Sequence, residues 1–248
     1  MYKEHPVFEK PDNENIKIWR YLDFTKFVSL LDKQALFFAR ADKLSDPFEG
    51  SYSKANIKLR PIIYKELGSY FDPVQKQFQV FSKEIKKFTL INSWHMNEYE
   101  SAAMWKLYLK TDEGVAIQST FKRLTESFHN YEGNVYIGKV KYIDYQTEWL
   151  PEGNTFYPFL HKRKSFEHER ELRAIIQILP VKDGNINLKL EVLDTGAYIP
   201  VDLDILIEKI FVSPMAPKWF NELVNSIINK YNLNKEVTQS SLAEGPVY

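Results

Sequence analysis

Three glutamates and an arginine alternate near residue 170. Glu167, Glu169, Glu171 and Arg173 occupy every second position, so in a strand the four side chains would share one face. Carboxylates this close raise one another's pKa, a common device for acid–base catalysis. Two plainer interpretations stay open. One is an exposed strand face with weak ion pairs, and the other is a helix in which Glu167 and Glu171 are i, i+4 neighbours.

A second feature is an arginine between two aromatic residues, Trp19-Arg20-Tyr21, at the end of a predicted strand. A planar guanidinium binds phosphate or carboxylate through paired N–H donors, while a neighbouring aromatic ring can stack on a ligand ring. The alternative is an edge-strand arginine whose stem passes core aromatics on its way to water. The residue types therefore predict either an anion site or an ordinary strand edge.

A third feature is the segment Asp46-Pro47-Phe48-Glu49-Gly50. Aspartate before proline, followed by glycine, is typical of a tight turn in which Asp46 accepts backbone hydrogen bonds. This structural role is our main expectation. In the functional alternative, Asp46 or Glu49 lines a cleft beside the first strand.

Composition excludes several kinds of site. The chain has no cysteine, which removes disulfides, thiolate catalysis and zinc sites that use sulfur. Its 9 glycines form neither type of phosphate-binding loop, and no Gly-x-Ser-x-Gly elbow occurs. A net charge of zero argues against a scaffold for duplex nucleic acid. No two histidines have helical metal-ligand spacing, so we assign no metal ligand, although His168 among glutamates keeps a carboxylate metal site as an alternative.

The elements that must position these residues predict a single α+β domain over residues 16–240, after a polar leader at 1–15. We expect a mixed, mostly antiparallel sheet with flanking helices. No apolar run approaches the ~20 residues that span a bilayer, which favours a cytoplasmic protein without a membrane partner. Asp23 and Thr120 are expected helix N-caps. Apolar spacing predicts strands over 16–22, 36–41, 88–94, 114–119, 134–143 and 171–179, and helices over 24–31, 72–85, 100–110, 121–128 and 156–164.

Taken in order, these motifs resemble a bacterial family described only as a domain of unknown function (DUF), number 2971. The resemblance runs roughly from Ile18 to the C-terminus. It departs from many relatives at Ser93-Trp94-His95, where a second serine is replaced by histidine. The matching motifs are the Trp19–Tyr21 strand, the Leu36–Gly50 strand and turn, Ser93, Met104-Trp105 with Tyr108, Gly114 to Ile117, and Glu169, Glu171 and Arg173.

The order of Arg20, Ser93 and Glu171 also resembles ADP-ribosyltransferases of the Arg-Ser-Glu type. That resemblance implies that Arg20 holds the NAD pyrophosphate and that Ser93 orients the nicotinamide ribose or supports the catalytic glutamate. It implies that Glu171 binds the ribose 2′-hydroxyl and stabilises an oxocarbenium-like transition state, while Glu169 activates the acceptor. Tyr21 or Trp105 would stack on nicotinamide. Asp46 and Arg173 complete the predicted substrate-binding set.

The hypothesis is therefore an NAD-cleaving enzyme, with a nucleotide as small-molecule partner and a protein or nucleic-acid acceptor of unknown identity. NAD is expected as a substrate, and no cofactor is assigned with certainty. Two alternatives from other classes stay open. One is a non-catalytic binding or regulatory module of the bacterial defence type, and the other is a carboxylate metal nuclease using Asp46, Glu169 and Glu171.

Overall fold

Nine strands of the described residues form one sheet. The computed structural model describes residues 1–109, 111–179, 181–182, 184–187 and 193–246. The strand order is β11-β2-β3-β1-β4-β12-β13, with β8 beside β3 and β5 beside β8. Only the β12–β13 pair is parallel among these nine, so the predicted α+β class with a mostly antiparallel sheet is confirmed. The strands are β1 (Lys17–Asp23), β2 (Ala35–Arg40), β3 (Thr89–Met96), β4 (Gly114–Thr120), β5 (Tyr136–Lys139), β8 (Glu171–Gln177), β11 (Gly196–Pro200), β12 (Lys209–Val212) and β13 (Val237–Gln239).

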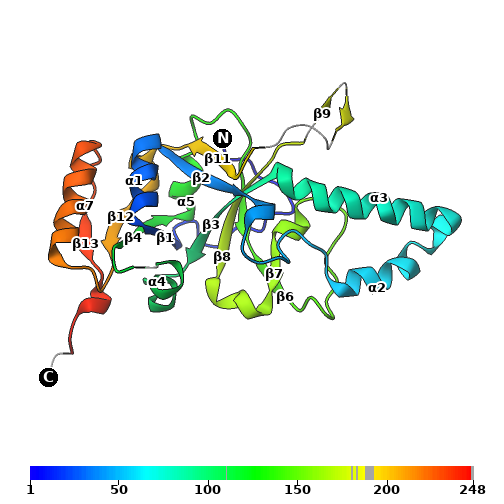
Figure 1. Cartoon of the computed structure of the whole chain (residues 1–248), viewed down its shortest axis with the longest axis horizontal. Coiled ribbons are helices and arrows are strands. Elements are labelled where there is room, and N and C mark those ends of the chain that lie inside the picture. The colour runs from blue at the N-terminus through cyan, green and yellow to red at the C-terminus, as the bar shows by residue number, and fades with distance from the viewer. Residues whose placement is uncertain (110, 180, 183, 188–192, 247–248) are drawn as a thin grey trace.

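The sheet forks along one edge of β3. Near its start β3 pairs with β2, with Ile91 opposite Ala39, and at its end it pairs with β1, with His95 opposite Trp19. Its other edge pairs with β8 over seven residues. Residues 92–94 pair with neither β1 nor β2, so the two branches diverge there (Figure 1). This divergence exposes a stretch of strand edge in the middle of the sheet.

Alternate side chains of β3 and β8 point to opposite faces of the sheet, one toward the hydrophobic core and the other toward polar residues. Leu90 and Leu172 pack in the main hydrophobic core, whereas Ser93 and Arg173 are direct cross-strand partners on the opposite face. Because successive side chains of a strand point to opposite faces, the same two strands supply both core residues and polar residues.

The helices begin where their caps predict. Asp23 Oδ1 accepts a hydrogen bond from the backbone N of Lys26 at 2.9 Å at the start of α1 (Phe24–Lys33). Thr120 Oγ1 accepts one from Arg123 N at 3.1 Å at the start of α5 (Phe121–Glu126). Both predicted N-caps are confirmed. The sheet is also flanked by α4 (Ala102–Tyr108), α6 (Leu203–Leu206) and α7 (Lys218–Lys230).

Two helices project from the sheet as an arm, which we define as residues 54–88 (Figure 1). They are α2 (Lys54–Ile63) and α3 (Phe71–Glu84), joined by a 3₁₀ turn at Lys65–Tyr70. The helix predicted over 72–85 is confirmed by α3. The sequence analysis missed α2, which contains Pro61 and exposes most of its apolar side chains. None of the residues of α3 (Phe71–Glu84) is buried.

Two predicted elements near the site are wrong. The helix expected over 156–164 is a 3₁₀ turn, Tyr157–Phe159, followed by β7 (His161–Arg163), which pairs in parallel with β6 (Lys141–Ile143). The strand expected over 134–143 is interrupted between β5 and β6. Of the alternatives left open for residues 167–173, one strand face that carries all four side chains is excluded, because Glu167 and Glu169 lie in a 3₁₀ turn, Lys164–Glu169, and β8 begins only at Glu171.

The N-terminal leader is attached to the body. Phe8 is buried against Tyr136 and Phe156, with ring centroids 5.5 and 5.0 Å away, and Tyr2 forms a β-bridge with Val135. No helix among the described residues is both long and apolar enough to cross a bilayer.

Candidate functional site

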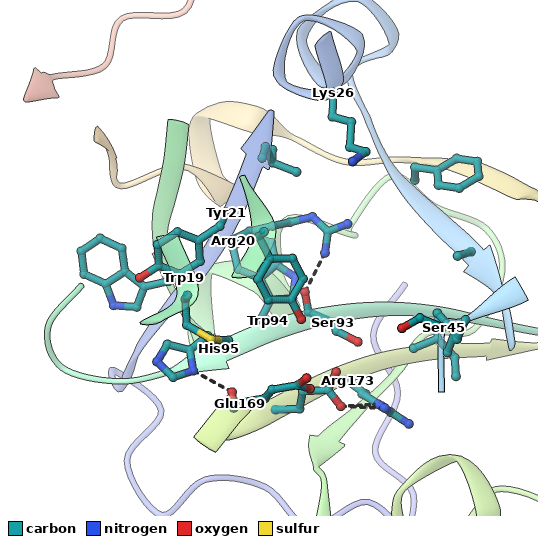
Figure 2. A pocket seen from close by; sticks show the side chains of 18 of the residues that line it. Trp19, Arg20, Tyr21, Lys26, Ser45, Ser93, Trp94, His95, Glu169 and Arg173 are labelled. Carbon is teal, nitrogen blue, oxygen red and sulfur yellow. Dashed lines mark hydrogen bonds and ion pairs between the residues drawn. The ribbon is translucent and has the colours of Figure 1, made fainter. Parts of the chain in front are cut away.

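A cavity of about 280 Å³ lies in the fork, at the lower end of the size range of ligand pockets (Figure 2). Strands β1, β2, β3 and β8 form its walls, and α4, β7 and the turn after β2 complete it. Six of the eight side chains predicted for the site line this cavity, although they come from three separate parts of the chain. They are Arg20, Tyr21, Ser93, Glu169, Glu171 and Arg173.

Arg20 extends across the gap between the two branches of the sheet. Its Nη1 donates a hydrogen bond to the backbone oxygen of Ser93 at 2.6 Å, where β3 pairs with neither β1 nor β2, and its guanidinium lies 5.9 Å from the Trp94 ring centroid. Burial lowers the pKa of Arg20 to about 10, and the nearby Tyr108 offsets this only in part. Among the described residues Arg20 has no carboxylate partner. The half-buried cation is therefore a poorly compensated charge facing the cavity.

The other cations of the cavity are all paired. Lys26 at the mouth lies 2.7 Å from Asp23, Lys162 is bonded to Glu169, and Arg173 is bonded to two glutamates. Figure 2 shows Lys26 reaching from α1 toward the cavity. Arg20 is thus the one cation lining the cavity, in the described part of the chain, that has no acidic neighbour within ion-pair distance.

Arg173 is saturated by protein groups. Its Nη1 and Nη2 donate to the two oxygens of Glu49 at 2.8 and 2.7 Å, which is the paired geometry of a strong arginine–carboxylate contact. Its Nε donates to Glu171 Oε2 at 2.9 Å, and Nη1 also donates to the carbonyl of Phe159 at 2.8 Å. With 1% exposure, Arg173 orients the two glutamates, so we assign it a positioning role rather than direct ligand contact.

Glu171 keeps one oxygen free of hydrogen bonds. Arg173 occupies Oε2, whereas Oε1 accepts no hydrogen bond from the described residues and lies 3.7 Å from Lys162 Nζ. The guanidinium holds the carboxylate in place from one side. The free oxygen is the one that can accept a hydrogen bond from a ligand in the cavity.

The surroundings of Glu169 raise its pKa above the ordinary value for a glutamate. Burial, and then the neighbouring charge of Glu171, raise its pKa, while the hydrogen bond from Lys162 at 2.5 Å opposes that rise. For Lys162, burial acts to lower the pKa, but Glu171 and Glu49 outweigh it and the pKa is raised. A carboxyl with a raised pKa beside a second carboxylate is a common arrangement for acid–base chemistry.

Two predicted site residues lie outside the cavity lining. The Asp46 carboxylate accepts from Arg163 Nη2 at 2.8 Å and from the backbone of Phe48 at 3.0 Å, so it has the expected turn role. Trp105 donates its indole N–H to Glu100 at 2.9 Å and packs edge-on against Tyr21 at 4.9 Å. Trp105 therefore supports the aromatic wall without lining it.

Four of the other residues that line the cavity, Glu49, Lys162, His95 and Tyr108, carry polar groups that bear on its chemistry. The sequence analysis named Glu49 as a possible cleft residue but did not include it in the site. Lys162 was not predicted for the site because residues 156–164 were wrongly expected to form a helix. His95 donates through Nδ1 to the backbone of Glu169 at 2.6 Å, and burial lowers its pKa, so its buried Nε2 is an acceptor without a partner among the described residues. Tyr108, part of the Met-Trp-x-x-Tyr motif, has its pKa raised by burial and stays protonated.

The carboxylates of the cavity are engaged with cations. Glu49 and Glu171 bind Arg173, Glu169 binds Lys162, and Asp46 binds Arg163 outside the cavity. No group of three or more His, Asp or Glu side chains in the described part of the chain is arranged to hold a metal ion. The carboxylate metal site suggested by the sequence has no such group to support it.

Comparison with protein-family models, curated proteins and solved structures finds no match for this chain. Membership of the DUF 2971 family and the likeness to ADP-ribosyltransferases therefore stay predictions. The charged and aromatic side chains that line the cavity are therefore the evidence on function.

Proposed function

We propose that the cavity binds an anionic nucleotide and cleaves its N-glycosidic bond, with NAD as the expected substrate. One observation carries this proposal. Arg20, Ser93 and Glu171 line one cavity from three adjacent strands, and Arg20 is a half-buried cation without a carboxylate partner among the described residues. A phosphate group would supply the charge that Arg20 lacks.

The walls suit a heteroaromatic ring attached to a sugar. Trp19, Tyr21 and Trp94 line the cavity, and aromatic faces stack on ligand rings. The hydroxyl of Ser93 makes no hydrogen bond with the described residues, so it is free for a ribose hydroxyl. Because the cavity is small, it suits the nicotinamide and ribose half of NAD, with the pyrophosphate at Arg20 and the adenosine half extending toward solvent.

The paired glutamates suit the chemistry of that bond. Nicotinamide leaves with the electron pair of the bond between its nitrogen and ribose C1′ and becomes neutral, which creates positive charge on the ribose. The carboxylate of Glu171, fixed by Arg173, stabilises that charge. A hydroxyl oxygen of water or an acceptor then adds to C1′, and its proton passes to Glu169. Burial and Glu171 raise the pKa of Glu169, which makes it a better base for this step.

A non-catalytic binding module is the second candidate. Glu171 is 5% exposed and already bonded to Arg173, as expected of a structural ion pair. In this reading the cavity binds a nucleotide through Arg20 and leaves its bonds intact.

Release of nicotinamide from NAD tests the enzymatic proposal and separates the two candidates. Purified wild type should release nicotinamide, and Glu171→Gln should lower the rate by about 100-fold or more, because it removes charge needed only in the transition state. Glu152→Gln is the matched control, since Glu152 is a buried carboxylate bonded to Arg60 at 2.7 Å outside this cavity. Binding of NAD without release, under varied acceptors, would favour the module over the enzyme.

A further inference from the structure

The arm concentrates positive charge in a chain that is neutral as a whole. Residues 54–88 contain eight Lys and Arg against three Asp and Glu, a net charge of +5, so the rest of the chain carries −5. Of the seven lysines, only Lys87 has a carboxylate within ion-pair distance among the described residues, namely Glu84 at 2.6 Å. The overall neutrality of the sequence therefore conceals a local basic surface.

A groove of about 270 Å³ runs between α2 and α3 near the root of the arm. Three cations line it: Arg60, Lys83 and Lys86. Arg60 is 2% exposed and its guanidinium lies 4.9 and 4.5 Å from the ring centroids of Tyr52 and Phe78. Its Nε donates to Glu152 at 2.7 Å, but its Nη2 has no partner among the described residues. The groove therefore holds an incompletely bonded guanidinium beside two lysines.

Lys86 is the second poorly compensated cation of the groove. Burial lowers its pKa, and the more distant carboxylates of Glu49, Asp42 and Asp46 offset this only in part. An anion bound in the groove would stabilise the charged form of this ammonium group. Among the described residues, Lys83 and Lys86 thus lack a carboxylate within ion-pair distance, whereas Arg60 has Glu152 and leaves only its Nη2 without a partner.

The outward face of α3 is mostly polar, although Val74 and Val80 are also exposed on this helix. Lys76, Gln77, Gln79 and Lys83 are exposed along it, and Tyr70 is 73% exposed where the helix begins. A face that enters lipid would be apolar, whereas lysines and glutamines bind phosphates and base edges. Tyr70 lies at the tip of the arm, at the other end of α3 from the groove, and an exposed tyrosine there is a stacking position for an unpaired base of a strand that follows the helix.

We propose that the α2–α3 groove and the outer face of α3 bind the backbone of a single-stranded nucleic acid. A single strand fits better than a duplex, because the negative remainder of the molecule opposes long-range attraction of a duplex while stacking on Tyr70 adds short-range affinity. The groove and the cavity are lined by consecutive residues of one turn: Glu49 lines the cavity and Gly50 lines the groove. The inference stands without the proposed NAD chemistry.

Fluorescence anisotropy with a labelled, short poly-thymidine oligonucleotide tests it. Wild type should bind, and its affinity should fall steeply between roughly 50 and 200 mM salt. Lys83→Ala with Lys86→Ala should weaken binding by at least about 10-fold and reduce the slope of log affinity against log salt by about 1.4, since each lost phosphate contact removes roughly 0.7. Tyr70→Ala should weaken binding by about 5-fold or more and leave the salt slope unchanged.

The matched control is Lys218→Ala with Lys230→Ala. Both lysines are exposed on α7, at the opposite end of the molecule from the arm (Figure 1), and the pair changes the charge by the same amount. The control should bind as wild type does. Three results would overturn the proposal: no binding at the lowest salt, equal loss in both double variants, or binding to phosphatidylserine vesicles in preference to the oligonucleotide. Thermal unfolding of each variant verifies that it is folded.

Discussion

The buried contact between Arg173 and its two glutamates gives the sharpest prediction of stability. Arg173→Met keeps the length and apolar stem of the side chain and removes the guanidinium. Glu49 and Glu171, which are 4% and 5% exposed, then lose their closest cation. Removing one partner of a buried ion pair typically costs about 3–5 kcal/mol, since the remaining charge stays buried.

The position of Lys162 sets where in that range the loss should lie. Its ammonium group is 3.4 Å from Glu49 and 3.7 Å from Glu171, so it still compensates part of the orphaned charge. We therefore expect a loss near the lower end, about 3 kcal/mol at pH 7. For a chain of this size such a loss lowers the melting temperature by roughly 6–12 °C.

The loss should also depend on pH in a defined direction. In wild type, burial acts to raise the pKa of Glu49, but Arg173 outweighs it and the pKa is lowered. Stability from this group is therefore present above the unfolded pKa of roughly 4.3 and is lost only as pH falls through the lower folded pKa. Without Arg173 the burial of Glu49 prevails and its pKa is raised, so the variant gains stability as pH falls from 7 toward 5. The difference between wild type and variant should narrow over that interval.

Urea unfolding at pH 7 and pH 5 measures this difference. Arg123→Met is the control, because Arg123 is a half-buried arginine that donates to backbone carbonyls and has no carboxylate partner in the described part of the chain. Arg173→Met combined with Glu49→Gln should recover part of the lost stability, since one buried charge is removed with its partner. A loss below about 1 kcal/mol, or a loss equal at both pH values, would refute this reasoning.

Two further predictions concern Lys162 in the cavity and Gly50 in the turn that follows Glu49. Lys162→Met removes the hydrogen bond that opposes the raised pKa of Glu169, so the limb of the nicotinamide-release profile that needs ionised Glu169 should move to higher pH; an unmoved limb contradicts the role of Glu169. Gly50→Ala should cost about 1–3 kcal/mol in urea unfolding, because φ is +65° and an added Cβ would lie 2.4 Å from the Phe159 ring. Gly153→Ala, with open space around it, should leave stability within about 0.5 kcal/mol, and equal losses in both variants would count against the predicted strain.

The strands that carry the cavity could be predicted because their signals are local. Alternation and apolar runs identified β1, β3 and β8, and single polar residues identified the caps of α1 and α5. The shared edge of β3 could not be predicted, since strand neighbours depend on contacts far apart in sequence. No short sequence pattern indicates that β1 and β2 both pair with one edge of β3, which is the arrangement that brings Arg20 near Ser93.

The ion pairs of the site could not be predicted from the sequence either, because their partners lie far apart along the chain. Arg173 binds Glu49 from 124 residues away, and Arg163 binds Asp46 from 117 residues away. The sequence analysis assigned neither Lys162 nor Lys164 to the site. The strand β7 turns Lys162 inward, while Lys164 is exposed and pairs with Glu148 at 2.9 Å. The sequence shows which residues are charged, but it does not show which acidic and basic side chains form ion pairs.

The central claim is that Arg20 supplies the unpaired positive charge of a nucleotide pocket. Calorimetric titration of NAD into wild type, Arg20→Met and Arg123→Met tests it most directly. Arg20 has no carboxylate to orphan among the described residues, so its replacement should leave the protein folded while weakening NAD binding by about 10- to 100-fold. Arg123→Met should bind NAD as wild type does. No NAD binding to wild type, or equal affinity in wild type and Arg20→Met, would contradict the claim.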